Sequence, residues 1–122
     1  MSLNYLEFDY SEDADGVGTF DALAATSPAH QAAVLAEVAS VLAWAQHAFE
    51  GQRAALDEGG EWDYDLQGWR EFSALDVLHF DEHSGELSVQ PQAAGAARHT
   101  VSLSVTGTPC FCAAFRERFH ST

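Results

Sequence analysis

The stretch His99–Thr106, HTVSLSVT, decides the fold because two kinds of side chain alternate strictly along it. Apolar side chains stand at Val101, Leu103 and Val105, and hydroxyl side chains stand between them. Successive residues of a β-strand point to opposite faces of a sheet, so this pattern predicts a strand with one buried face and one solvated face. A sheet with one face in water is typical of an antiparallel arrangement.

A short helix is predicted directly after this strand. Thr108 suits the cap position and Pro109 suits the first turn. Three phenylalanines follow at four-residue spacing, at Phe111, Phe115 and Phe119. Residues with this spacing share one face of a helix, and we expect that face to pack on the sheet.

A longer helix is predicted between Ser27-Pro28 and Gly51, over about 22 residues. Serine followed by proline is a helix start signal, and glycine suits the position after a helix end. Apolar residues recur between them at helical spacing: Val34, Leu35, Val38, Val41, Leu42, Ala45 and Phe49.

The other expected elements are strands and turns. Strands are predicted over 4–10, 61–69, 74–81 and 87–90, with a helical turn at 20–25, a hairpin turn at 81–87 and a loop at 91–97. Gly68 suggests a bulge or a strand end. The segment Ala74–Asp81 is apolar on both faces and is interpreted as a central or an irregular strand. The order β-α-β-β-β-β-α predicts an α+β fold, a single domain over residues 1–122 with both helices on one face of a mainly antiparallel sheet.

The charge of the chain is its most unusual property. Nineteen acids stand against five arginines and no lysine, which gives a formal net charge of −14. Residues 1–65 hold thirteen of the acids and one arginine, a net of −12. Such a field repels nucleic acid and anionic membranes and attracts basic proteins or cations. The chain also lacks an apolar run long enough to cross a membrane.

The uncovered face of the predicted sheet is the expected partner-binding surface. Its acidic members, together with two acids of the first loop, are Glu7, Asp9, Asp13, Asp15, Glu61, Asp63 and Asp65. A protein-interaction module that binds a basic partner is therefore one hypothesis, and an inhibitor of the immunity or antitoxin kind is an example by analogy. A monomer or a homodimer is expected, and like charges disfavour a dimer contact through this face.

Metal binding or enzymatic activity is the alternative hypothesis. His79, Asp81 and His83 are two residues apart in sequence. On a continuous strand they would share one face, and they could hold a metal ion together. The loop between Asp9 and Asp21, with Asp13 and Asp15, resembles a calcium loop in composition, but Ala22 stands where such a loop needs a glutamate. The hairpin turn at 81–87 would also separate His83 from His79.

The sequence contains no strong catalytic or cofactor signature. Asp63 and Asp65 are spaced as an acid–base pair can be, but nothing indicates the apolar cleft that such a pair needs. Nucleophile-elbow and phosphate-loop patterns are absent. A binding function is therefore favoured over an enzymatic one, and no cofactor is expected.

The two cysteines and the N-terminus suggest a location. Cys110 and Cys112 point about 200° apart on the predicted helix, so they are poorly placed to bond each other, and we expect two reduced thiols in the core. No charged segment followed by an apolar stretch opens the chain, as a signal peptide would require. The sequence thus predicts a cytoplasmic protein, and its arginine and alanine usage suggests a bacterium.

Overall fold

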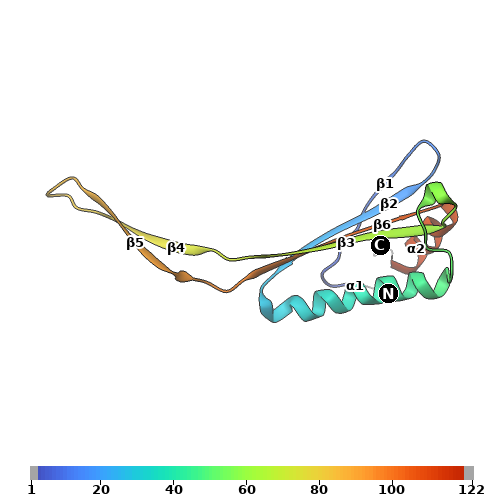
Figure 1. The fold of residues 1–122 in the computed structure, drawn as a ribbon, viewed down its shortest axis with the longest axis horizontal. Helices are drawn as coiled ribbons and strands as arrows, with labels where there is room; N and C mark the ends of the chain where they lie inside the picture. The colour runs from blue at the N-terminus through green and yellow to red at the C-terminus, as the bar shows by residue number, and fades with distance from the viewer. Residues whose placement is uncertain (1–2, 120–122) are drawn as a thin grey trace.

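The computed structural model describes residues 3–119, which form a body and a long projecting arm (Figure 1). The body holds a four-stranded antiparallel sheet in the order β1-β2-β6-β3, and the arm is a two-stranded hairpin of β4 and β5. The elements are β1 (Asp9–Glu12), β2 (Gly18–Thr26), α1 (Pro28–Ala48), the 3-10 turn η1 (Leu56–Glu58), β3 (Trp62–Glu71), β4 (Ala74–Phe80), β5 (Leu87–Ala94), β6 (Arg98–Gly107) and α2 (Pro109–Phe119). The predicted α+β class with a mainly antiparallel sheet is confirmed.

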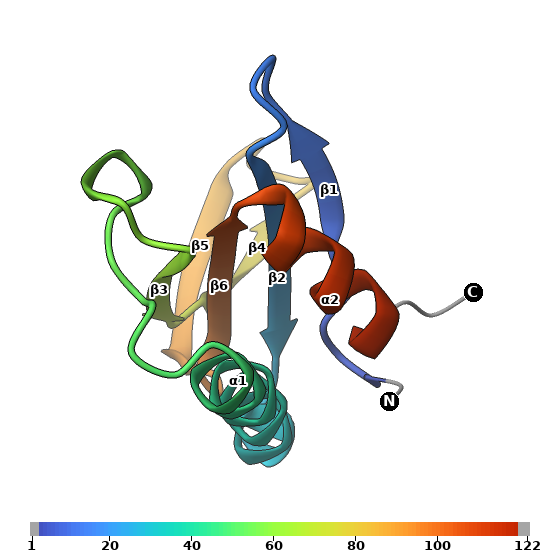
Figure 2. The same ribbon diagram turned by 90° about the vertical axis from the view of Figure 1, so that its right-hand side faces the viewer.

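Both helices cover the same face of the sheet, as the sequence predicted (Figure 2). The strand β6 lies between β2 and β3, and its Val101, Leu103 and Val105 are buried against the helices. The long helix contributes Val34, Val38, Val41 and Ala45 to this core, and α2 contributes Phe111, Cys112, Phe115 and Phe119. We call the helix-covered side of the sheet the inner face and the opposite side the outer face.

The close packing of α2 depends on a glycine in the central strand. The Phe111 ring lies over Gly107 and stacks on Trp62, with ring centroids 5.6 Å apart and planes 4° apart. A Cβ atom at position 107 would overlap that ring. The glycine therefore sets how near the start of α2 approaches the sheet.

The N-terminal segment before β1 is held by one side chain of α1. The Glu37 carboxylate accepts hydrogen bonds from the backbone N–H groups of Asn4, Tyr5 and Leu6, at 2.8–3.2 Å. Leu6 is thereby placed in the core. Glu37 is also the only charged residue of α1.

Two predictions near the N-terminus were wrong. The expected helical turn at 20–25 is part of the strand β2, because Phe20, Ala22 and Ala24 alternate inward while Asp21 and Leu23 point outward. The expected strand at 4–10 pairs only from Asp9 onward, since Glu37 takes the N–H groups at 4–6. The acidic stretch 11–21 accordingly forms a β-hairpin between β1 and β2.

The largest departure from prediction is the arm. The segment Ala74–Phe80 is not a central strand, because it pairs only with β5 and every residue of both strands is exposed. It matches the alternative of an irregular strand, since its register shifts between Ala74 and Asp76. The predicted loop at 91–97 is a strand as far as Ala94. Gly68 does not mark a bulge; it pairs in register with Val101, and the one register shift lies in the arm at 74–76.

Candidate interaction surface

The outer face of the sheet carries a row of polar side chains across all four strands, and three of the four are acidic. Asp9 of β1 lies opposite Asp21 of β2, Asp21 lies opposite Ser104 of β6, and Ser104 lies opposite Asp65 of β3. Neighbouring strands are about 4.8 Å apart, so the three carboxylates and the hydroxyl form one line across the sheet. All three aspartates are exposed.

A second row, next to the first, consists mainly of hydroxyl groups. Ser11, Thr19, Thr106 and Asp63 occupy matching positions on the four strands, and the Thr19 and Thr106 hydroxyls are 3.3 Å apart. Asp63 is neutralised locally, because Arg53 Nη1 lies 3.1 Å from its carboxylate. That is the only ion pair between side chains of residues 3–119. The face thus combines hydrogen-bonding groups with unneutralised negative charge.

The acidic row carries an energetic cost. Like charges directly opposite each other on neighbouring strands destabilise a sheet, and Asp9 and Asp21 are so placed. The Ser104 hydroxyl donates a 2.5 Å hydrogen bond to the Asp21 carboxylate, which offsets part of the repulsion without removing the charge. A charge arrangement that costs folding stability is typical of a surface kept for binding.

Apolar side chains lie on the outer face beside these rows. Leu23 is 65% exposed and belongs to the next row, opposite Ser102, and Trp69 is 48% exposed one row further on. Exposed tryptophan is among the commonest anchors of protein interfaces. The outer face therefore offers an apolar contact next to an acidic one.

The structure separates the seven predicted partner-binding acids into four groups. Asp9, Asp63 and Asp65 lie on the outer face, as expected. Glu7 lies before β1 and lines a pocket beside α2. Glu61 is not on the face at all, because its carboxylate accepts a 2.5 Å hydrogen bond from the Thr108 hydroxyl at the start of α2.

Asp13 and Asp15 lie in the turn between β1 and β2. The Asp13 carboxylate accepts hydrogen bonds from the backbone N–H groups of Asp15 and Val17, at 2.9 and 3.0 Å. Gly16 in this turn has φ of 83°, a conformation that glycine adopts easily. Asp13 therefore shapes the hairpin at the rim of the outer face.

Sequence reasoning missed Asp21 as a member of the acidic face. It was assigned to the end of the acidic loop, next to an expected helical turn. The signal was the alternation of Phe20, Ala22 and Ala24 with polar or larger neighbours, which is a strand pattern despite its small alanines.

The metal candidates are not brought together. Residues 3–119 contain no group of three or more histidine, cysteine, aspartate or glutamate side chains placed to hold a metal ion. His79 lies on β4, while Asp81 and His83 lie in the turn that follows. The Asp81 carboxylate accepts the N–H groups of His83 and Ser84, at 2.9 and 3.3 Å, and so stabilises the turn.

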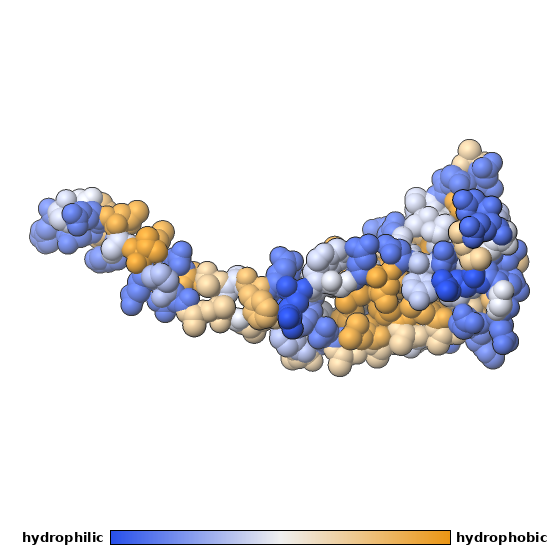
Figure 3. Space-filling model, in the orientation of Figure 1, coloured by the Kyte–Doolittle hydropathy of each residue, from blue (hydrophilic) through white to orange (hydrophobic). Residues whose placement is uncertain are grey.

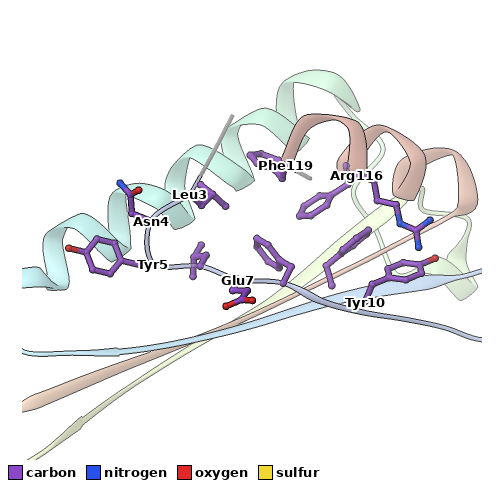
Figure 4. Close-up of a pocket in the computed structure, with 11 residues that line it drawn as sticks. Leu3, Asn4, Tyr5, Glu7, Tyr10, Arg116 and Phe119 are labelled. Atoms are coloured by element: carbon purple, nitrogen blue, oxygen red, sulfur yellow. The ribbon is translucent and has the colours of Figure 1, made fainter. Parts of the chain in front are cut away.

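A pocket of about 470 Å³ lies between the N-terminal segment and α2 (Figure 4). Phe8, Phe20 and Phe115 are among its walls, and the Arg116 guanidinium lies 3.7 Å above the Tyr10 ring at one end. The Tyr10 hydroxyl donates a 2.6 Å hydrogen bond to Glu12, and this bond raises the pKa of Tyr10 to about 12. Among the described residues that line this pocket, Arg116 is the only cation, and its guanidinium lies over an aromatic ring.

The two thiols differ in environment, which corrects the expectation of two core cysteines. Cys112 is buried, and burial raises the pKa of its thiol, whose Sγ lies 3.4 Å from the Gly107 carbonyl oxygen. Cys110 is exposed in the first turn of α2. Both are free, and the buried thiol serves as a packing group.

Comparison of the chain with protein-family models, with curated proteins and with solved structures found no match. None of the helices within residues 3–119 is long and apolar enough to cross a membrane.

Proposed function

We propose that this protein is a protein-interaction module that binds a basic protein through the outer face of its sheet. The observation that carries the proposal is the row formed by Asp9, Asp21 and Asp65 across four strands, with Ser104 between them. Arginine and lysine side chains of a partner would neutralise carboxylates that have no cation of their own. The destabilising Asp9–Asp21 pair would thereby be relieved on binding.

Leu23 and Trp69 support the proposal as apolar contacts beside the acidic row. Charge complementarity mainly speeds association and selects partners, whereas buried aromatic side chains supply much of the affinity. An inhibitor of the immunity or antitoxin kind belongs to this proposed class, because nucleases are basic where they bind nucleic acid. A cytoplasmic location is part of the same proposal.

A capture experiment with a charge-matched control tests the proposal. Immobilised protein is incubated with lysate of the native host at about 50 mM and about 500 mM salt, where surface charges are weakly and strongly screened. We expect a basic protein to be retained at low salt by the unmodified chain and lost with the variant D9N/D21N/D65N.

The control variant E50Q/D57N/E58Q also removes three negative charges, at exposed positions outside the sheet. It should retain the partner. Equal loss from both variants would mean that net charge alone holds the partner, and equal retention by both would place the contact elsewhere; either result contradicts the proposal.

A further inference from the structure

The arm exposes an apolar face that none of residues 3–119 covers. Register pairs Leu78 with Val89 and Phe80 with Leu87, so these four side chains lie together on one face of the hairpin. They are 56–66% exposed. Figure 1 shows the arm projecting away from the body, and Figure 3 shows hydrophobic side chains gathered along it behind a hydrophilic tip.

The opposite face of the arm is mixed in character. Val77 lies opposite Gln90 and His79 lies opposite Ser88 on that side. A two-stranded hairpin by itself is at best marginally stable in water, and it needs a third strand or a packed face to persist. The arm therefore requires a surface that covers its apolar face.

The strands of the arm are nearly free of charge in a strongly acidic chain. Asp76 is the only charged residue of β4, and β5 has none. Two copies of a chain with a net charge of −14 repel each other over most of their surface. The arm strands offer a contact that buries little of this charge.

Charged residues lie mainly at the two ends of the arm. The tip carries Asp81, Glu82 and Glu86. The base carries Arg70 and Arg98, two of the five cations of the chain, together with Glu71 opposite Arg98, so its net charge is +1. Neither arginine belongs to an ion pair within the described part of the chain, and Arg70 lies over the Phe72 ring at 5.5 Å. Two identical arms laid antiparallel would bring each acidic tip to the basic base of the other.

We propose that the arm is a homodimerisation element: the apolar faces of two arms, from two copies of this chain, pack against each other in antiparallel orientation. The arrangement is two-fold symmetric, so the tip-to-base contact forms twice. The apolar pairs Leu78–Val89 and Phe80–Leu87 are buried between the arms. With 7 and 8 residues in its strands, each arm places about half of them on the contact face, which makes a contact at the small end of specific interfaces.

Sedimentation equilibrium of the full chain over a concentration series tests the dimer. The unmodified protein should reach twice the mass of one chain. Leu78→Asp, on the apolar face, should raise the dissociation constant by about 30-fold or more, the scale of losing an interface hot spot.

Val77→Asp is the matched control, since it adds the same charge at the neighbouring position on the other face of β4. It should leave the dissociation constant within about threefold of the original. Circular dichroism of both variants checks that the body remains folded. An unmodified chain that is monomeric at every concentration, whether or not its arm binds a foreign protein, overturns the proposal, and so does equal weakening by both variants.

Charge reversal tests the antiparallel orientation. The base variant R70E/R98E and the tip variant E82R/E86R should each dimerise more weakly than the unmodified chain. An equimolar mixture of the two should form a heterodimer, because each end then meets the opposite sign, and a chain with all four changes should dimerise again. Failure of both combinations to recover dimerisation excludes the tip-to-base contact.

Discussion

At the scale of single residues, Glu37 shows how one side chain fixes a whole segment. Its carboxylate takes three successive backbone N–H groups and so prevents residues 4–6 from continuing β1. Hydrogen bonds to a charged acceptor are stronger than neutral ones. Residues 4–6 are therefore held by α1 rather than by the sheet.

Glu37→Ala should lower the free energy of unfolding by about 2 kcal/mol, because it leaves these N–H groups without their acceptor and loosens Leu6. Urea unfolding measures the loss, and limited proteolysis should show earlier cleavage near residue 5. Glu50→Ala removes one exposed negative charge after α1 and should change neither reading. A loss below about 0.5 kcal/mol for Glu37→Ala would show that the segment is held by other contacts.

Tyr10 gives a prediction about alkaline pH. Its folded pKa of about 12 lies above the ordinary value of 10, since the hydrogen bond to Glu12 favours the neutral phenol. A raised folded pKa contributes stability that is fully present below pH 10 and is lost as the pH rises from 10 to 12.

Absorbance titration of tyrosine checks this value. Tyr10→Phe should remove a phenol that ionises near pH 12, and Glu12→Gln should move that ionisation to lower pH. An unchanged titration curve in both variants would contradict the assigned hydrogen bond.

At the scale of elements, the contact between β6 and α2 depends on the absence of a side chain at Gly107. An added methyl group would push the Phe111 ring off Trp62 or shift the helix. Overpacking of this kind typically costs 1–3 kcal/mol. Gly107→Ala should therefore destabilise the protein by about that amount.

Thermal unfolding of the variant measures this cost. Gly95→Ala is the control, because the nearest atom to an added Cβ there, the Ser73 carbonyl oxygen, is 3.6 Å away in ordinary contact. Equal effects of the two changes would indicate a general penalty for replacing glycine in this chain.

The sequence predicted those elements whose own pattern is strong. The alternation of 99–106, the helix that became Pro28–Ala48 and the phenylalanine stripe of α2 each bury one face in the body, so pattern and structure agree. The arm was not predictable in this way, because apolar residues on both faces of β4 signal a buried strand only where a covering surface lies in the same chain.

The candidate site was predictable in part for a related reason. Asp63 and Asp65 lie in a strand with regular alternation, so their face could be inferred. Glu61 and Glu7 could not be placed, since a cap to Thr108 and a segment held by Glu37 are tertiary contacts without a local signal. The row that joins Asp9, Asp21 and Asp65 depends on strand order, which sequence periodicity does not contain.

At the scale of the whole molecule, the net charge of −14 opposes folding through self-repulsion. Raising the salt concentration from about 10 mM to about 500 mM shortens the Debye length from roughly 30 Å to below 8 Å. We expect a gain near 1 kcal/mol, or about 4 °C in melting temperature for a chain of this size.

Calorimetry in sodium chloride measures the shift. The variant D9N/D21N should gain less from salt, because it lacks the closest pair of like charges on the outer face. A melting temperature that falls with added salt would show that attractive charge pairs outweigh the repulsion.

The arm also bears on how the chain finds its fold. Because β3 leads into β4 and β5 leads into β6, the strands form one long ribbon that closes at the turn 81–86. Glu71 and Arg98 are partners separated by 26 residues, and loop closure over such a distance slows folding. If strand pairing starts at the turn and proceeds pair by pair towards the body, each step closes only a short loop.

Gly85, with φ of 74°, belongs to this turn. Gly85→Ala should slow refolding by about fivefold while leaving the unfolding rate nearly unchanged, the behaviour of a residue structured in the transition state. Stopped-flow measurements give both rates, and a change in the unfolding rate alone would show that the turn forms after the transition state. If the turn forms before it, the tip of the arm, which lies farthest from the core, aligns β6, the core's central strand.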